Sequence, residues 1–356
     1  MVKTRTRLLA IMVGAVVLAA VAWVALSRSP KPAAPAPQAA SAAGETPRIA
    51  SAAAVVAPTA SSVTTGQMAN AASEDAGAVI AARWGSGRGE LGRSRPHEGN
   101  PEGPMSFARS GDELFVLDQV NGRVVRYDAS GKVRGTFETT PTTQDLTVAK
   151  DGTVVLLDRL VDKTVRLVDK NGRAIGALPL PPDRVGEPGL VTGVFVDGKD
   201  VYVEKEHGVL TRIGATDGSA EDPAELTGRP SKDGTLLLMA VLSPAAARVD
   251  VNAFDRRLGS LRFARAVTFA RPARQIMLLD TDRRGTIYVG VLGGNPEMVH
   301  IACLDPSDGR AIGRLSVPTS ATPEESFRDF TVADDGTILL ALRTEDGIEY
   351  QSAHCP

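Results

Sequence analysis

One short pattern recurs six times along this chain of 356 residues and constrains its fold more than any other feature. Each copy is a turn containing glycine, followed by a run of β-branched or other apolar residues, the local signal of a strand after a tight turn. The turn glycines are Gly111, Gly152, Gly198, Gly234, Gly285 and Gly336. Successive glycines lie 36 to 51 residues apart. Because a four-stranded unit of about this length is typical of a propeller blade, the pattern predicts an all-β, six-bladed β-propeller of four-stranded antiparallel blades.

A second glycine turn lies 20 to 24 residues after the first in four of these units, so that each unit divides into two hairpins. No amphipathic helix of the kind that connects parallel strands separates them. The fourth unit is the least regular. We therefore expect blades at about 104–140, 144–181, 190–228, 232–272, 274–318 and 327–354.

The last of these units has no room for a fourth strand before Pro356. An apolar strand, 77–84, is left over before the first blade. Pairing it with the last blade would close the ring and remove an exposed edge. The sequence therefore predicts a propeller over 77–356 that is closed by its N-terminal strand.

The first blade also carries a family resemblance. The stretch 115–132, with Asp118, Asn121 and Arg123, resembles the signature of NHL-repeat β-propellers, and 83–92 is similar to the Gly-rich stretch that they place between blades. The resemblance covers about 80–180, whereas later blades match only in the glycine turn and its strand. It implies a six-bladed propeller of a membrane-anchored bacterial type, and it selects no activity, because one fold hosts many functions.

The N-terminal region predicts a membrane anchor. Residues 8–26 form an uninterrupted apolar run of about 28 Å as a helix, close to the thickness of a bilayer core. The basic residues of the tail 1–7 favour a cytoplasmic N-terminus. We expect a single-pass signal anchor in the cytoplasmic (inner) membrane, with the propeller on the periplasmic or extracellular side. A cleaved signal peptide, ending near Ala20–Ala22, is the alternative.

Residues 27–76 are expected to be a disordered tether. The neighbouring window 31–80 contains 18 alanines and no aromatic residue, so it cannot bury enough apolar surface to fold. The net charge of the chain is −2, and beyond residue 30 there are 36 basic and 42 acidic side chains. This balance argues against a nucleic-acid partner.

Two sets of residues are candidate binding sites. Gln144, Asp145, Arg328 and Asp329 lie at the start of innermost strands, where we expect them to face one mouth of the central channel. They either hold a cation or substrate, or are solvated strand-start residues. The second set is a basic surface of Arg262, Arg265, Arg271 and Arg274, which either recognises an anionic partner or protects a strand edge.

The sequence contains no recognisable catalytic motif, so no catalytic residue and no cofactor are assigned. Asp118 and Asp158 follow strand ends, where a carboxylate usually accepts N–H groups of the next turn. The favoured function is a membrane-tethered binding or scaffolding module for a protein or polysaccharide. The alternative is a lactonase-like hydrolase that uses Asp145, Asp329 and a divalent metal such as calcium in the channel.

The two cysteines are expected to be free, mostly buried thiols. Cys303 and Cys355 are assigned to the third strands of adjacent blades. Facing sheets stand about 10 Å apart, whereas a disulfide requires Cα atoms about 4.4–6.8 Å apart. Only the freedom of Cys355 near the chain end would bridge that gap.

Overall fold

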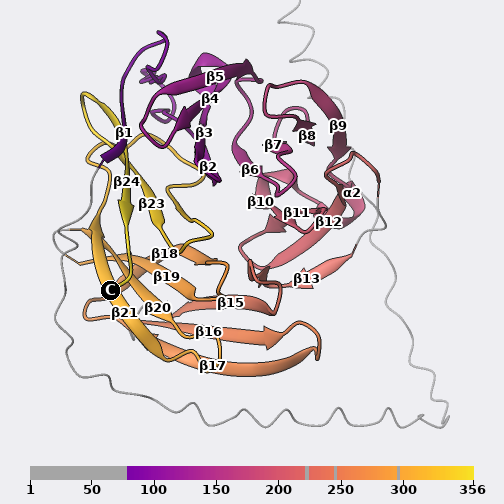
Figure 1. Cartoon of the computed structure of the whole chain (residues 1–356), viewed down its shortest axis with the longest axis vertical. Coiled ribbons are helices and arrows are strands. Elements are labelled where there is room, and N and C mark those ends of the chain that lie inside the picture. The colour runs from indigo at the N-terminus through magenta and orange to yellow at the C-terminus, as the bar shows by residue number, and fades with distance from the viewer. Residues whose placement is uncertain (1–77, 221–223, 244–246, 295–296) are drawn as a thin grey trace, which may run out of the picture. The chain divides into compact units, whose positions relative to one another are not determined.

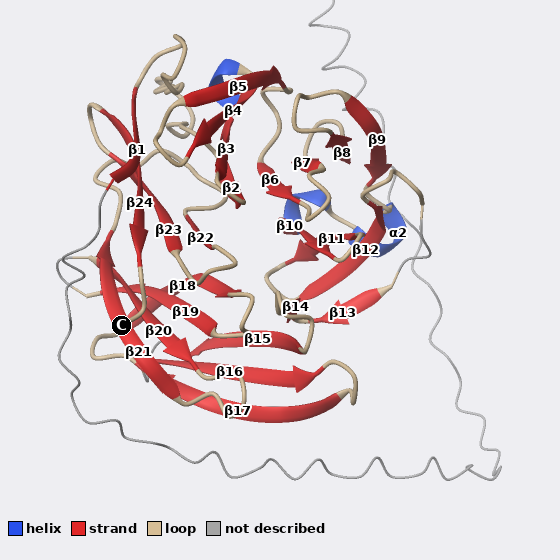
Figure 2. Ribbon diagram, in the orientation of Figure 1, coloured by secondary structure: helices blue, strands red, loops and turns tan. Residues whose placement is uncertain are grey.

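The computed structural model describes residues 78–220, 224–243, 247–294 and 297–356 (Figure 1). Their strands form six separate antiparallel sheets of four strands each. In Figure 2 these sheets surround a common centre, and the first strand of each, β2, β6, β10, β14, β18 or β22, lies nearest to it. The chain is a six-bladed β-propeller, as the repeats predict.

The first three blades follow the predicted ranges closely. Blade 1 comprises β2 (Ser106–Ser110), β3 (Glu113–Asp118), β4 (Arg123–Asp128) and β5 (Val133–Glu138). Blade 2 comprises β6 (Asp145–Val148), β7 (Val154–Asp158), β8 (Thr164–Val168) and β9 (Ala174–Pro179). Blade 3 comprises β10 (Val191–Asp197), β11 (Asp200–Lys205), β12 (Val209–Ala215) and β13 (Glu225–Thr227). The short helices η1 (Gln119–Asn121), α2 (Pro182–Val185) and η2 (Pro188–Leu190) lie in their connections.

The other three blades differ more in strand length. Blade 4 comprises β14 (Arg229–Pro230), β15 (Leu236–Ser243), β16 (Arg248–Asp255) and β17 (Ser260–Thr268). Blade 5 comprises β18 (Ala273–Thr281), β19 (Ile287–Gly293), β20 (Met298–Leu304) and β21 (Ala311–Pro318). Blade 6 comprises β22 (Phe330–Val332), β23 (Ile338–Arg343), β24 (Gly347–Ala353) and β1 (Ala78–Arg83). The described part of the fourth blade is irregular at β14, which has only two residues, and at the register shift between Ala253 and Phe254 in β16.

The N-terminal strand closes the ring, which confirms the prediction. β1 pairs antiparallel with β24, from Ala78 opposite Gln351 to Arg83 opposite Gly347. Ile80 and Ala82 are buried on this strand and pack with residues of blades 6 and 1. The edge that β24 would otherwise expose is therefore covered by a strand from the other end of the domain.

Apolar side chains of neighbouring sheets form the core between blades. Each cluster joins adjacent blades, such as Leu157 and Val165 of blade 2 with Val194 and Val203 of blade 3. The first glycine turn of each unit connects its first two strands at one end of the blade. Glycine is favoured there because the backbone is left-handed: the φ of Gly152 is +88°. We call the end of the ring that carries the glycine turns the turn end, and the opposite end, which carries the blade-to-blade connections, the loop end.

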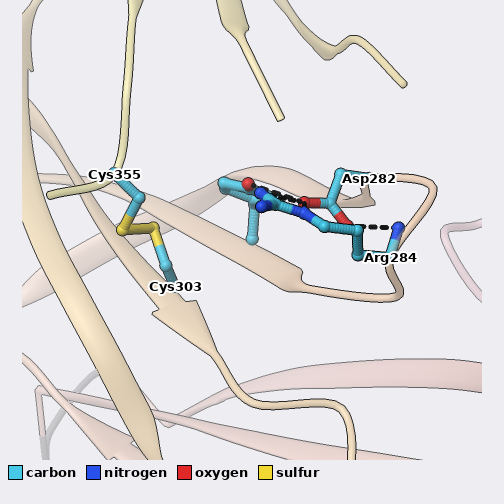
Figure 3. The surroundings of a disulfide bond; sticks show 5 residues. Asp282, Arg284, Cys303 and Cys355 are labelled. Atoms are coloured by element: carbon cyan, nitrogen blue, oxygen red, sulfur yellow. Dashed lines mark hydrogen bonds and ion pairs between the residues drawn. A yellow bond between two sulfur atoms is a disulfide. The ribbon is translucent and has the colours of Figure 1, made fainter. Parts of the chain in front are cut away.

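The prediction of two free thiols is wrong. Cys303 and Cys355 form a disulfide with Cα atoms 6.4 Å apart (Figure 3). Cys303 lies on β20, the third strand of blade 5, but Cys355 lies beyond the end of β24 rather than on a strand. The tail crosses from blade 6 to blade 5, where Cys355 Sγ packs on the backbone of Gly313 in β21. The spacing of paired sheets therefore does not limit its position.

The predicted anchor, 8–26, its tail, 1–7, and the tether, 27–76, lie outside the described residues. Within the described ranges, no helix has the length and apolar character needed to span a bilayer.

Candidate functional site in the central channel

The structure brings Asp145 and Arg328 into contact, although they are 183 positions apart in the sequence. Asp145 begins β6 of blade 2 and is fully buried, while Arg328 precedes β22 of blade 6. Arg328 Nη2 donates to Asp145 Oδ2 at 2.8 Å, and its Nε donates to Oδ1 at 3.2 Å. Arg328 therefore reaches past blade 1 to a carboxylate on blade 2.

The remaining hydrogen-bonding capacity of Asp145 is taken by three blades. Its Oδ1 accepts from Ser106 Oγ of blade 1 at 2.6 Å and from the N–H of Leu146 at 2.9 Å. Its Oδ2 accepts from the N–H of Val194 in blade 3 at 3.0 Å. A buried carboxylate requires such partners, and through them Asp145 links the innermost strands of blades 1, 2 and 3 by hydrogen bonds.

Arg328 lies in a mixed aromatic and charged environment. Its guanidinium carbon is 5.5 Å from the centre of the Phe195 ring, and that of Arg229 is 5.0 Å from the same ring. Burial by itself would lower the pKa of Arg328, but Asp145 first, then Asp280 and Glu204, raise it above its ordinary value. The side chain is therefore held as a cation near the axis.

Asp329 has a different partner. Arg343, whose exposed fraction is 1%, donates from Nη1 to Asp329 Oδ1 at 2.7 Å and from Nη2 to the carbonyl of Pro104 at 3.0 Å. Gln144 accepts the N–H of Arg159 at 3.2 Å. Of the four predicted channel residues, only Asp145 and Arg328 contact each other, and Asp145 and Asp329 each have their own arginine.

Sequence reasoning missed two further ion pairs, whose carboxylates Glu204 and Asp280 act electrostatically on Arg328. Glu204 at the end of β11 is buried and pairs with Arg229 of β14, from Nε to Oε1 at 2.7 Å and from Nη2 to Oε2 at 2.9 Å. Glu204 occupies the position in blade 3 that Asp118 and Asp158 hold in blades 1 and 2. The glutamate in place of aspartate is the only sequence signal of its different role. Its longer side chain reaches Arg229 of the next blade as well as His207 in its own turn, whose Nδ1 lies 3.5 Å from Oε2.

The second missed pair joins blades 4 and 5. Lys232 Nζ donates to Asp280 Oδ1 at 2.8 Å, and Asp280 Oδ2 accepts the N–H of Val332 in blade 6 at 2.9 Å. Val332 and Val194 both lie four residues before their turn glycine. Asp280 and Asp145 therefore bind the same backbone position of the following blade, although the two aspartates stand at different positions in their own blades.

The pKa of Glu204 reflects its pairing. Burial would raise it, but the charge of Arg229, with hydrogen bonds from His207, Arg229 and Thr192, lowers the pKa to about 2. Glu204 is thus ionised at neutral pH.

The four ion pairs described above contain four carboxylates and four cations. The carboxylates are Asp145, Glu204, Asp280 and Asp329, and the cations are Arg328, Arg229, Lys232 and Arg343.

This charge balance bears on a divalent metal such as calcium. Both oxygens of Asp145 are occupied by N–H and O–H donors, and the ion pair of Asp329 lies with Arg343. The donors present do not fit calcium without breaking these pairs. Among the described residues, no group of three or more His, Cys, Asp or Glu side chains is placed to hold a metal ion.

Of the predicted basic surface, Arg262 and Arg265 lie on β17, the outer strand of blade 4, Arg271 lies in the connection after it, and Arg274 lies on β18 of blade 5. Arg262 pairs with Asp255, Arg265 donates to the carbonyl of Asp308, and Arg274 pairs with Glu297. Arg271 is exposed and has no ion pair with a described residue. The structure therefore leaves one of the four arginines available to an outside anion.

The two strand-end aspartates have structural partners. Asp158 accepts the N–H groups of Val161 and Asp162 in the turn that follows it, as predicted. Asp118 differs, because its Oδ1 accepts the N–H of Gly92, from before the first blade, at 2.7 Å.

No family model and no curated protein matches this sequence. Among solved structures, the chain is similar to the hydrazine synthase of Kuenenia stuttgartiensis, with a TM-score of 0.46 and 16% identity over 67% of this chain and 74% of that one. It is similar to a streptogramin B lyase, with a TM-score of 0.43 and 12% identity over 73% of this chain and 96% of that one. It is also similar to BamB from Moraxella catarrhalis, with a TM-score of 0.42 and 13% identity over 78% of this chain and 99% of that one. Likenesses this distant say nothing of activity, so the fold assignment rests on the six sheets, and the NHL resemblance stays a prediction.

Proposed function

We propose that this protein is a binding or scaffolding module, tethered by residues 8–26 to the cytoplasmic membrane with its propeller on the outer side, and that it recognises a protein or polysaccharide. The observation that carries the proposal is the channel cluster. Its carboxylates are paired with arginine or lysine: Asp145, Glu204 and Asp280 pair with residues of other blades, and Arg343, the partner of Asp329, also binds the carbonyl of Pro104 before blade 1. Side chains used in this way make a rigid frame, and recognition then falls to the surface loops and edges.

The disulfide supports the proposal that the propeller lies outside the cytoplasm. Disulfides persist in oxidising environments such as the periplasm or the cell exterior and are rare in the cytosol. Cys303 and Cys355 join blade 5 to the tail of blade 6, and this link agrees with a propeller outside the cytoplasm.

A calcium titration tests this proposal against a metal-dependent hydrolase. The thermal midpoint of the full chain in detergent is measured with and without calcium, for the wild type and for the Asp145→Asn, Asp329→Asn double variant. We expect no calcium-dependent rise in either protein, although the double variant should melt lower because it loses two ion pairs. A rise in the wild type that the double variant loses would overturn the proposal and favour the hydrolase.

A further inference from the structure

The Gly-rich segment before blade 1 forms one wall of a surface groove. Its backbone packs tightly on blade 1: the φ of Gly89 is +87°, and a Cβ there would lie 3.4 Å from Cγ2 of Val133 in β5. The other wall is β5 itself. The hollow between them has a volume of about 360 Å³ and is lined by Arg88, Arg123, Val133, Gly135 and Thr136.

The signature residues of the first blade hold this segment in place. Asp118 Oδ2 accepts from Nδ2 of Asn121 and from Nε of Arg123, both at 2.8 Å. Arg123 in turn donates to the carbonyls of Ser86, Gly87 and Glu90 at 2.8–3.1 Å. Asn121 donates to the carbonyl of Gly85 at 2.9 Å. These bonds fix the loop before any partner arrives, which lowers the entropy cost of binding.

Arg88 lies at the tip of this fixed loop and is exposed. It has no hydrogen bond or ion pair with a described residue. The groove lining contains no carboxylate, and because Arg123 is already paired with Asp118, Arg88 is the arginine of the lining whose charge has no partner among the described residues. Charge complementarity therefore favours an anionic occupant.

The shape of the occupant follows from β5. This strand is outermost in its sheet and pairs with β4 alone, so its other edge carries backbone groups with no strand partner. Gly135 has no side chain beyond a hydrogen atom and Thr136 has a small one, so another backbone can approach. An extended peptide can pair with such an edge through main-chain hydrogen bonds, while side-chain contacts supply the specificity.

We propose that the groove between the loop at Arg88 and strand β5 binds an extended acidic segment of a partner protein by strand addition. Arg88 contacts a carboxylate of that segment, and the backbone of Val133–Glu138 pairs with it. This inference rests on the proposed binding function and names the surface and the chemistry of the partner. It places recognition on blade 1 rather than on the predicted basic surface.

A labelled peptide of alternating glutamate and valine serves as the probe, and its binding to the full chain in detergent is followed by fluorescence anisotropy. The same peptide with lysine in place of glutamate is the control for charge. We expect the acidic peptide to bind and the basic one not to bind. Arg88→Glu should weaken binding at least tenfold, whereas the matched control Arg271→Glu, also an exposed arginine without an ion pair to a described residue, should change it less than twofold.

Hydrogen exchange separates strand addition from simple charge attraction. With the acidic peptide bound, the backbone amides of Val133–Glu138 should exchange at least fivefold more slowly. Absence of binding, binding without this protection, or a larger effect of Arg271→Glu than of Arg88→Glu would each overturn the groove assignment. Binding of polygalacturonate that displaces the peptide without protecting β5 would overturn it in favour of a glycan. These results are independent of the calcium titration, which alone decides the metal-enzyme alternative.

Discussion

Glu204 shows how one side chain joins two blades. Its carboxylate is 1% exposed and accepts both arms of Arg229, while Thr192 Oγ1 donates to Oε2 at 3.0 Å. Removing one partner of a buried pair leaves the other charge uncompensated, and this costs more than the pair contributes. The connection between blades 3 and 4 therefore depends on the charge of Glu204.

The lowered pKa of Glu204 predicts an acid-sensitive contribution to stability. The ionised form is favoured by folding, so the contribution is complete above pH 4.5, the ordinary value, and is lost as pH falls towards about 2. A shift of this size corresponds to about 3 kcal/mol of unfolding free energy. We expect Glu204→Gln to lower stability by about this amount at pH 7 and to differ little from wild type near pH 2.

Urea denaturation across this pH range measures the effect. Glu138, exposed on β5, provides the control, and Glu138→Gln should follow the wild-type profile. A Glu204→Gln variant as stable as wild type at pH 7 would contradict the assigned role of the pair.

At the scale of elements, blade 6 is assembled from both ends of the domain. β1 supplies its outer strand, and Trp84, directly after β1, donates from Nε1 to the carbonyl of Thr344 at 2.9 Å. Arg93 and Arg95 both pair with the buried Glu324, before β22. The disulfide ties the other end of blade 6 to blade 5. Ring closure is therefore secured by pairing, ion pairs and a covalent bond.

Two truncations test the contribution of β1. Deleting residues 1–75 leaves β1 intact, so we expect the melting temperature of the full chain. Deleting residues 1–86 removes β1 and Trp84, exposes the edge of β24, and should lower stability by a few kcal/mol, because burying a side chain such as Ile80 contributes roughly 1.5–3 kcal/mol. Calorimetry compares the two fragments, and equal melting temperatures would show that the ring closes in another way.

At the scale of the whole molecule, both ends of the propeller lie at its turn end. Ala78 begins β1 opposite Gln351, near the last residues of β24, and Arg83 ends it opposite Gly347. The chain that precedes the propeller therefore joins it at the turn end. Arg328 and the blade-to-blade connections lie at the loop end of the ring, opposite Ala78.

Membrane attachment is tested on the native protein. If residues 8–26 are an uncleaved anchor, the protein should stay in the membrane fraction through washes with high salt and with alkaline carbonate, because apolar insertion resists both. Mass spectrometry of the N-terminus provides the second readout. A mature N-terminus near Trp23 would show that the segment is a cleaved signal peptide.

The sequence by itself determined the architecture. Glycine turns and short apolar strands are local signals, because each depends on a few neighbouring residues, and their regular spacing predicts the six blades, their approximate bounds and the closing role of 77–84. The turn after Asp158 was predictable for the same reason, since its hydrogen bonds span only three or four residues.

Only the tertiary structure decided which charged residues meet. Arg328 reaches Asp145 because the ring closes, whereas Glu204 reaches Arg229 and Cys355 reaches Cys303 because consecutive blades pack together, at separations of 183, 25 and 52 residues. No local pattern encodes such contacts, since they depend on the path of whole blades and of a tail outside any strand. The same applies to the groove at Arg88, whose walls are the segment before blade 1 and β5, the last strand of that blade, and become neighbours only in the folded structure.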